Sequence, residues 1–156
     1  YALVTADGAA EMDHDRLEAS ALPLLEAEID AALRLLAPGG SLVLKFFEAG
    51  TEETRAQLIW AARHFEDSTI LKPTHSRPTN SEAYLVGVGF RTEPRIVDVA
   101  AWDRSLRRIV AALCEAQRLA LEATLLRAQP MSTRPHRHDR ARHRRDGRGA
   151  GKRVGR

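Results

Sequence analysis

The sequence predicts an α/β fold, in which a mostly parallel sheet has strands that alternate with helices. Apolar runs at residues 1–6 and 41–47 lack polar alternation, which is typical of strands buried on both faces of a parallel sheet. Residues 15–37 and 51–65 instead carry apolar side chains at intervals of three and four, the spacing of amphipathic helices. This alternation of strands and helices indicates an α/β domain.

Two further apolar segments, residues 67–72 and 83–90, are joined by the polar loop 75–81. Because this connection contains no helix, we expect the last two strands to be antiparallel. Thr51 is the expected N-cap of the second helix, since a threonine hydroxyl accepts a hydrogen bond from the first free backbone N–H groups.

Residues 98–128 are predicted to form one long amphipathic helix. Its expected inner face consists of Val99, Trp102, Leu106, Ile109 and Leu113. Residues 134–156 hold ten Lys or Arg against two Asp, so the positive charge of the chain belongs to its tail. We therefore expect three parts: an α/β domain over residues 1–97, an amphipathic helical extension over 98–129, and a disordered basic tail over 130–156.

The composition excludes several classes of protein. No apolar run approaches the roughly 18–20 residues that cross a bilayer, so we expect no membrane partner. Cys114 is the only cysteine, which excludes an internal disulfide and favours an intracellular location. The tail histidines lack cysteine or carboxylate partners at zinc-site spacing, so we expect no metal. Since Tyr1 already lies in an apolar run, we expect a fragment whose N-terminal strands are missing.

Three polar residues lie near the carboxyl ends of the predicted strands or just beyond, where α/β sheets place ligands: Asp7, Lys45 and Glu82. Lys45 is the most informative, because an ammonium among apolar residues is costly unless it is paired. A lysine beside an acceptor can serve as a general base, although one at a strand end can also simply reach out to solvent. Alone, Asp7 could cap a turn and Glu82 could start a surface strand.

The segments Val4–Ala9, Leu44–Glu48 and Lys72–Glu82 resemble three consecutive motifs of the FtsJ-like RNA 2′-O-methyltransferases. The last segment, with the order Ser-Arg-Pro-Thr-Asn-Ser-Glu, resembles the cap-directed branch of that family most. The resemblance implies a Rossmann-like, S-adenosylmethionine-dependent methyltransferase fold whose last strand is antiparallel. It also implies that residues 1–97 are the C-terminal part of the catalytic domain.

Members of this family carry a Lys-Asp-Lys-Glu tetrad, and the resemblance maps its last three members onto Asp7, Lys45 and Glu82. Lys45 would accept the proton of the ribose 2′-hydroxyl, while Asp7 and Glu82 would orient Lys45 and hold that hydroxyl. The first lysine of the tetrad has no counterpart here, because neither Lys72 nor Lys152 fits its position.

The resemblance further implies S-adenosyl-L-methionine as cofactor, with Asp7 and Gly8 at its site, and RNA contacts by Arg77, Asn80 and Ser81. Those three loop residues could equally serve turn formation and solvation. The implied function is RNA 2′-O-ribose methylation near the mRNA cap, with capped mRNA as partner, in the cytoplasm or nucleus or as a viral protein in a host cell. The alternatives are a ribosomal RNA 2′-O-methyltransferase and a truncated, non-catalytic methyltransferase fold that binds RNA through the basic tail.

Overall fold

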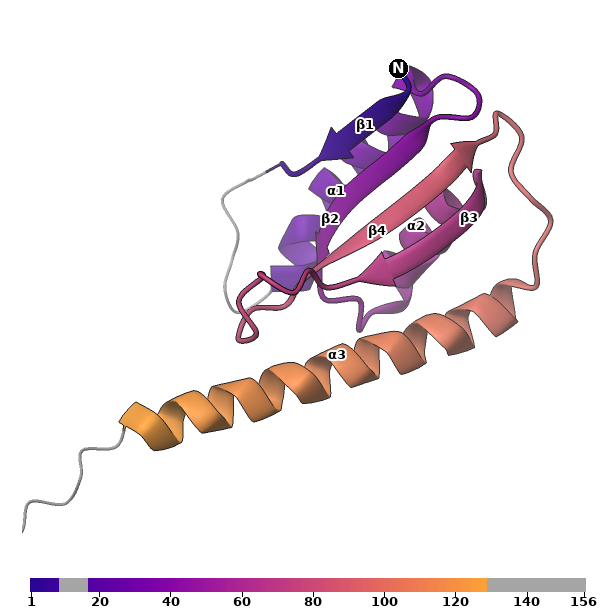
Figure 1. Ribbon diagram of the computed structural model, residues 1–156. Helices are drawn as coiled ribbons and strands as arrows, with labels where there is room; N and C mark the ends of the chain where they lie inside the picture. The colour runs from indigo at the N-terminus through magenta and orange to yellow at the C-terminus, as the bar shows by residue number, and fades with distance from the viewer. Residues whose placement is uncertain (9–16, 129–156) are drawn as a thin grey trace, which may run out of the picture.

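The chain folds around a four-stranded sheet with the strand order β1-β2-β4-β3, seen in a computed structural model that describes residues 1–8 and 17–128. The strands are β1 (Leu3–Ala6), β2 (Ser41–Phe47), β3 (Phe65–Leu71) and β4 (Glu82–Phe90). β1 is parallel to β2, and β4 lies antiparallel between β2 and β3 (Figure 1). Three strands therefore share one direction and the last is reversed, which confirms the predicted α/β class. The tail prediction, residues 130–156, lies outside the described residues.

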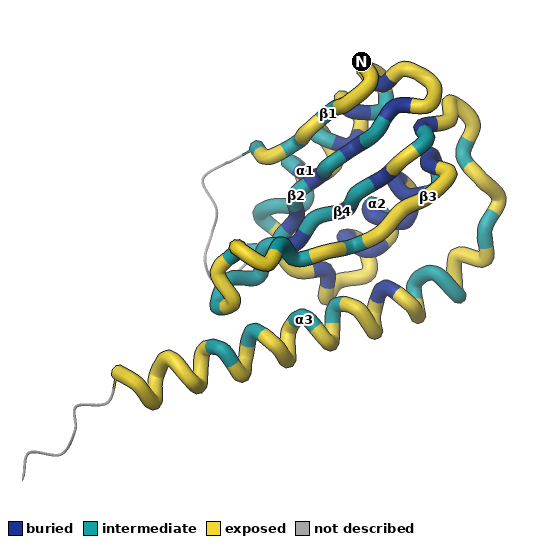
Figure 2. The backbone as a smooth tube through the Cα atoms, viewed as in Figure 1, coloured by how far each residue is buried: buried dark blue, intermediate teal, exposed yellow. Residues whose placement is uncertain are grey.

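The three helices are α1 (Leu17–Leu35), α2 (Glu52–Ala62) and α3 (Val99–Ala128). α1 and α2 pack against the same face of the sheet, whereas α3 runs past α2 and extends beyond the sheet at its C-terminal end (Figure 1). Buried residues gather between the sheet and α1 and α2, and most of α3 is exposed (Figure 2). None of the described helices combines the length and the apolar character that a membrane span requires.

Strand β2 divides its side chains between two different environments. Leu42, Leu44 and Phe46 are buried in the core against the helices, and the alternate residues are only half-buried. Lys45 belongs to the second set, so it lies on the face opposite α1 and α2. β1 departs from the expectation of a fully buried strand, because it is at the edge of the sheet and Leu3 is 56% exposed.

The loop between β2 and α2 is fastened to α1. The Thr51 hydroxyl accepts a hydrogen bond from the Thr54 N–H at 3.3 Å, which confirms the predicted N-cap. Glu18 of α1 in turn accepts from the Thr51 N–H at 2.9 Å and from the Gly50 N–H at 3.1 Å. Burial raises the pKa of Glu18, but the hydrogen bonds from Thr51, Thr54 and Gly50 outweigh it and leave the pKa below its usual value. Glu18 thus holds the end of β2 near α1.

The predicted inner face of α3 is correct only in part. Leu106 is buried, and Trp102 and Leu113 pack partly against the core. Val99 is instead 49% exposed and Ile109 40% exposed. An open cavity of about 350 Å³ lies between α3, α2 and β3, and Trp102, Leu106 and Ile109 of α3 all line it.

Gly87 of β4 lies directly over the ring of Phe65, and replacing it should test that packing. A Cβ atom at residue 87 would stand 2.5 Å from Cγ of Phe65, whose side chain is fully buried and cannot move aside. We expect Gly87→Ala to lower the free energy of unfolding by about 1–3 kcal/mol. Urea denaturation followed by circular dichroism measures the change. Val88→Ala, at a half-exposed position of the same strand, is the control and should cost much less.

Candidate active site

The candidate site lies at the edge of the sheet where β1 and β2 end. Asp7 directly follows β1, and Lys45 lies near the end of β2. Because β4 is antiparallel, its first residue, Glu82, comes to this same edge and pairs with Phe47. Lys45 is opposite Tyr84, two residues further along β4, so Lys45, Tyr84 and Glu82 share one face of the sheet.

Lys45 and Asp7 form an ion pair between Nζ and Oδ1. The lysine side chain is only 15% exposed, whereas the aspartate side chain is 64% exposed. The Lys45 ammonium also lies 5.3 Å from the centre of the Phe47 ring. The pairing with Asp7 offsets the cost of holding a cation among apolar residues, so Lys45 is a partnered cation and does not simply extend into solvent.

Glu82 is held by hydroxyl and amide donors around its carboxylate. The Tyr84 hydroxyl donates to Oε1 at 2.9 Å, the Ser76 hydroxyl to Oε1 at 3.4 Å, and Nδ2 of Asn80 to Oε2 at 3.5 Å. Burial raises the pKa of Tyr84, and the hydrogen bond to Glu82 raises it further, so this phenol stays a donor. The structure thus joins Asp7 to Lys45 directly and brings Glu82 to their edge of the sheet, held by separate partners.

The loop residues expected to contact RNA differ in what their side chains do. Arg77 is exposed, whereas Asn80 and Ser81 are half-buried. The Asn80 side chain is already engaged by protein groups, and the Ser81 carbonyl accepts from the Glu48 N–H at 3.5 Å. Of the three, Arg77 therefore presents the most accessible side chain for a ligand.

Two residues of this region were missed by reasoning from the sequence, Tyr84 and Lys72. Nζ of Lys72 donates to the Asn80 carbonyl at 2.8 Å, to Asn80 Oδ1 at 2.7 Å and to the Glu82 carbonyl at 2.9 Å. Burial lowers the pKa of Lys72, while the charge of Glu82 acts in the opposite direction. The sequence did contain a signal for Lys72, because this lysine lies at the end of a predicted strand, where the loop that leads to Glu82 begins.

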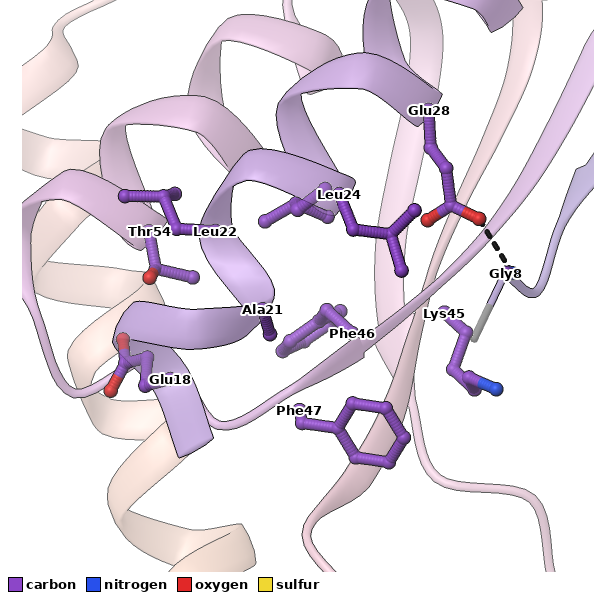
Figure 3. Close-up of a pocket in the computed structure, with 11 residues that line it drawn as sticks. Gly8, Glu18, Ala21, Leu22, Leu24, Glu28, Lys45, Phe46, Phe47 and Thr54 are labelled. Atoms are coloured by element: carbon purple, nitrogen blue, oxygen red, sulfur yellow. Dashed lines mark hydrogen bonds between the residues drawn. The ribbon is translucent and has the colours of Figure 1, made fainter. Parts of the chain in front are cut away.

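The cavity beside Gly8 is too small for a cofactor the size of S-adenosylmethionine. The cavity beside Gly8, shown in Figure 3, has a volume of about 20 Å³, which suits a single water molecule. The Gly8 N–H donates to Oε1 of Glu28 at 2.6 Å, so this amide is engaged by α1. In the same view the Lys45 ammonium points away from Phe46 and the α1 side chains. Neither this cavity nor the engaged Gly8 amide offers room for a ligand much larger than water.

Comparison with known proteins places this geometry in context. The family model described as FtsJ-like methyltransferase matches residues 1–90, which span β1 to β4 and the loops that carry the candidate site. The cap-specific mRNA (nucleoside-2′-O-)-methyltransferase 1 of Trypanosoma brucei brucei is 45% identical over 65 residues, which cover 42% of this chain and 18% of that protein.

Two further relatives match over a longer stretch. The cap-specific mRNA (nucleoside-2′-O-)-methyltransferase of Autographa californica nuclear polyhedrosis virus is 41% identical over 86 residues, 54% of this chain and 33% of that protein. The ribosomal RNA large subunit methyltransferase E of Gluconobacter oxydans is 37% identical over 86 residues, 55% of this chain and 30% of that protein. The chain thus spans between 18% and 33% of the length of these relatives.

Proposed function

This chain belongs to the FtsJ-like methyltransferase family, and from that premise we propose that it is the acceptor-side part of an S-adenosylmethionine-dependent RNA 2′-O-methyltransferase. The observation that carries the proposal is the Asp7–Lys45 ion pair at the sheet edge to which β4 also brings Glu82. A half-buried lysine held beside a carboxylate can take a proton from a hydroxyl group once its own amine is neutral, and the carboxylate then stabilises the ammonium that forms.

The cofactor of this family supplies a methyl group that is already activated toward nucleophiles. The residues of this chain then have two tasks, to place the ribose 2′-hydroxyl and to accept its proton. Lys45 Nζ, in its neutral form, is the proton acceptor, and it becomes the ammonium that pairs with Asp7. Asp7 fixes the direction of that amine, and Glu82, itself held by Tyr84, accepts a hydrogen bond from the sugar.

We further propose that the substrate is capped mRNA, methylated on the nucleotide next to the cap, in the cytoplasm or nucleus. Support comes from the relatives named as cap-specific, which are 41% and 45% identical, against 37% and 38% for those named as ribosomal RNA methyltransferases. Ribosomal RNA is the second candidate substrate, because its enzymes match over a stretch of similar length.

The test uses the full-length protein and S-adenosylmethionine with a labelled methyl group. We expect label to enter a short capped RNA at the 2′-oxygen of the first nucleotide. The same RNA with a 2′-deoxy first nucleotide should receive none, because the accepting oxygen is gone. Digestion to nucleosides and mass spectrometry locate the label.

The remaining arms of this experiment separate the alternatives. A further arm uses the same RNA without a cap, and labelling of it at the same rate as the capped RNA would reject the cap preference. Labelling of a large-subunit ribosomal RNA alone would establish ribosomal RNA as the substrate. RNA binding without any transfer to these substrates would favour the non-catalytic alternative and reject the proposed activity. Labelling of the 2′-deoxy RNA would reject transfer to that oxygen.

A further inference from the structure

We propose that Lys72 is a positioning residue that holds the acceptor loop, defined as residues 73–81, and sets the orientation of Glu82 through Asn80. This inference rests on the proposed function, since Glu82 is taken to hold the RNA hydroxyl. Lys72 follows β3 and Glu82 begins β4, so the ammonium ties together the two ends of the loop that connects these strands.

The hydrogen bonds of Lys72 account for its whole donor capacity. An ammonium has three N–H donors, and Nζ of Lys72 has three acceptors between 2.7 and 2.9 Å, all on Asn80 and Glu82. Because each donor has a protein acceptor, Lys72 stabilises the loop conformation and is not available to neutralise an RNA phosphate. The residue is half-buried, so these bonds are shielded in part from water.

The ammonium also selects the orientation of the Asn80 amide. A lysine ammonium can only donate, so the side-chain atom that faces it has to be the amide oxygen, Oδ1. The amide nitrogen then faces the other way and donates to Oε2 of Glu82 at 3.5 Å. The Glu82 carboxylate is thereby held by Asn80 at Oε2 and by the Tyr84 and Ser76 hydroxyls at Oε1. Lys72 bonds the Glu82 carbonyl directly and acts on the carboxylate through Asn80.

Removing this amine should impair the chemistry more than the fold. Backbone turns within the loop, from the Ser76 N–H to the Pro73 carbonyl at 2.9 Å and from the Asn80 N–H to the Arg77 carbonyl at 3.2 Å, do not involve Lys72. The loop should therefore still form, while the orientation of the Asn80 amide is lost. A misplacement of a catalytic group by about 1 Å can cost up to about a hundredfold in rate.

The test is Lys72→Met in the full-length protein, because methionine keeps an unbranched apolar side chain and removes all three donors. We expect kcat for transfer to RNA to fall between about tenfold and a hundredfold, with the KM for S-adenosylmethionine nearly unchanged. The melting temperature should fall only slightly, since water can reach the half-buried acceptors that Lys72 leaves. Lys72→Arg should restore little, since a planar guanidinium cannot direct three donors at converging acceptors. Recovery of full activity by arginine would mean that charge alone matters, and would overturn the inference.

A double-mutant cycle with Asn80→Ala separates positioning from a merely structural role. If Lys72 acts through Asn80, the loss from Lys72→Met in the Asn80→Ala background should be much smaller than in the native protein. Fully additive losses would overturn the inference, and so would unchanged kcat in Lys72→Met. Arg34→Met, which removes an exposed cation paired with Asp30 on α1, is the control for charge and should keep native kcat. If the native protein transfers no methyl group, the proposed function itself fails.

Discussion

Lys45→Ala should lower methyl transfer to an RNA 2′-hydroxyl by at least about a hundredfold in the full-length protein. Loss of a general base typically costs about 10²–10⁴-fold in rate, and loss of the group that places the hydroxyl adds to this. The variant also leaves Asp7 without its cationic partner at the end of β1. We expect the affinity for S-adenosylmethionine to change little, because we propose that Lys45 contacts the accepting hydroxyl and not the cofactor. Single-turnover kinetics and calorimetric titration with the cofactor measure the two quantities.

Lys45→Arg is the matched control for the same residue. Arginine keeps the positive charge and can pair with Asp7, but it stays protonated and cannot accept a proton at neutral pH. If Lys45 acts as a base, the arginine variant should be nearly as inactive as the alanine variant. Substantial activity in Lys45→Arg would limit Lys45 to an electrostatic role, and near-native transfer in Lys45→Ala would remove it from the site altogether.

Arg55→Met should give the second large effect, a loss of unfolding free energy of roughly 2–3 kcal/mol. Arg55 of α2 is 3% exposed, and its Nη1 donates to the Ala49 and Gly50 carbonyls in the loop after β2. Its Nε donates to Asp103 of α3 at 2.7 Å. The substitution leaves buried acceptors without donors and removes a tether of α3. Urea denaturation monitored by circular dichroism measures the loss.

The pH dependence of stability provides a further test of the Arg55 contact. The hydrogen bond from Arg55, followed by that from Arg107, holds the pKa of Asp103 below its usual value. A carboxylate with a lowered folded-state pKa contributes stability above its unfolded value of about 3.9, and that contribution is lost as the pH falls through the folded-state pKa. We therefore expect the stability gap between native protein and Arg55→Met to narrow below about pH 4.

Arg107→Met is the control for this test, because Arg107 bonds the other oxygen of Asp103 from an exposed position one turn along α3. Exposed pairs of this kind contribute little to stability. If Arg107→Met lost as much unfolding free energy as Arg55→Met, the burial of Arg55 would not be what makes its contact with Asp103 strong. If the stability difference between the native protein and Arg55→Met stayed constant from neutral to acid pH, the Asp103 contact would not account for the stabilising effect of Arg55.

Several features of the candidate site were predictable because they are local in the sequence. The apolar run that ends near Lys45 and the cap at Thr51 follow from side-chain periodicity and from hydrogen bonding within a few residues. The grouping of Asp7, Lys45 and Glu82 came from the resemblance of their motifs. Their roles in catalysis remain predictions that the substitutions above would test.

Other features depend on contacts that leave no local pattern. The engagement of the Gly8 amide by Glu28 joins residues 20 positions apart, and the tether from Arg55 to Asp103 spans 48 positions. Ile109 is 40% exposed and Leu106 is buried, although the spacing of both residues matched that of a buried helix face. Periodicity reports which face of an element is apolar, and it does not report whether another element covers that face.

The sequence by itself determined the strands, the helices and the residue types at the sheet edge, because backbone propensity and apolar spacing act over short distances. Only the tertiary structure decided how the polar groups are partnered. The antiparallel register of β4 sets Tyr84 opposite Lys45 and carries Glu82 to the same edge, and the loop from β3 brings Asn80 to Lys72. Each of these contacts requires two chain segments to meet at a particular register and distance, which is a property of packing and not of either segment alone.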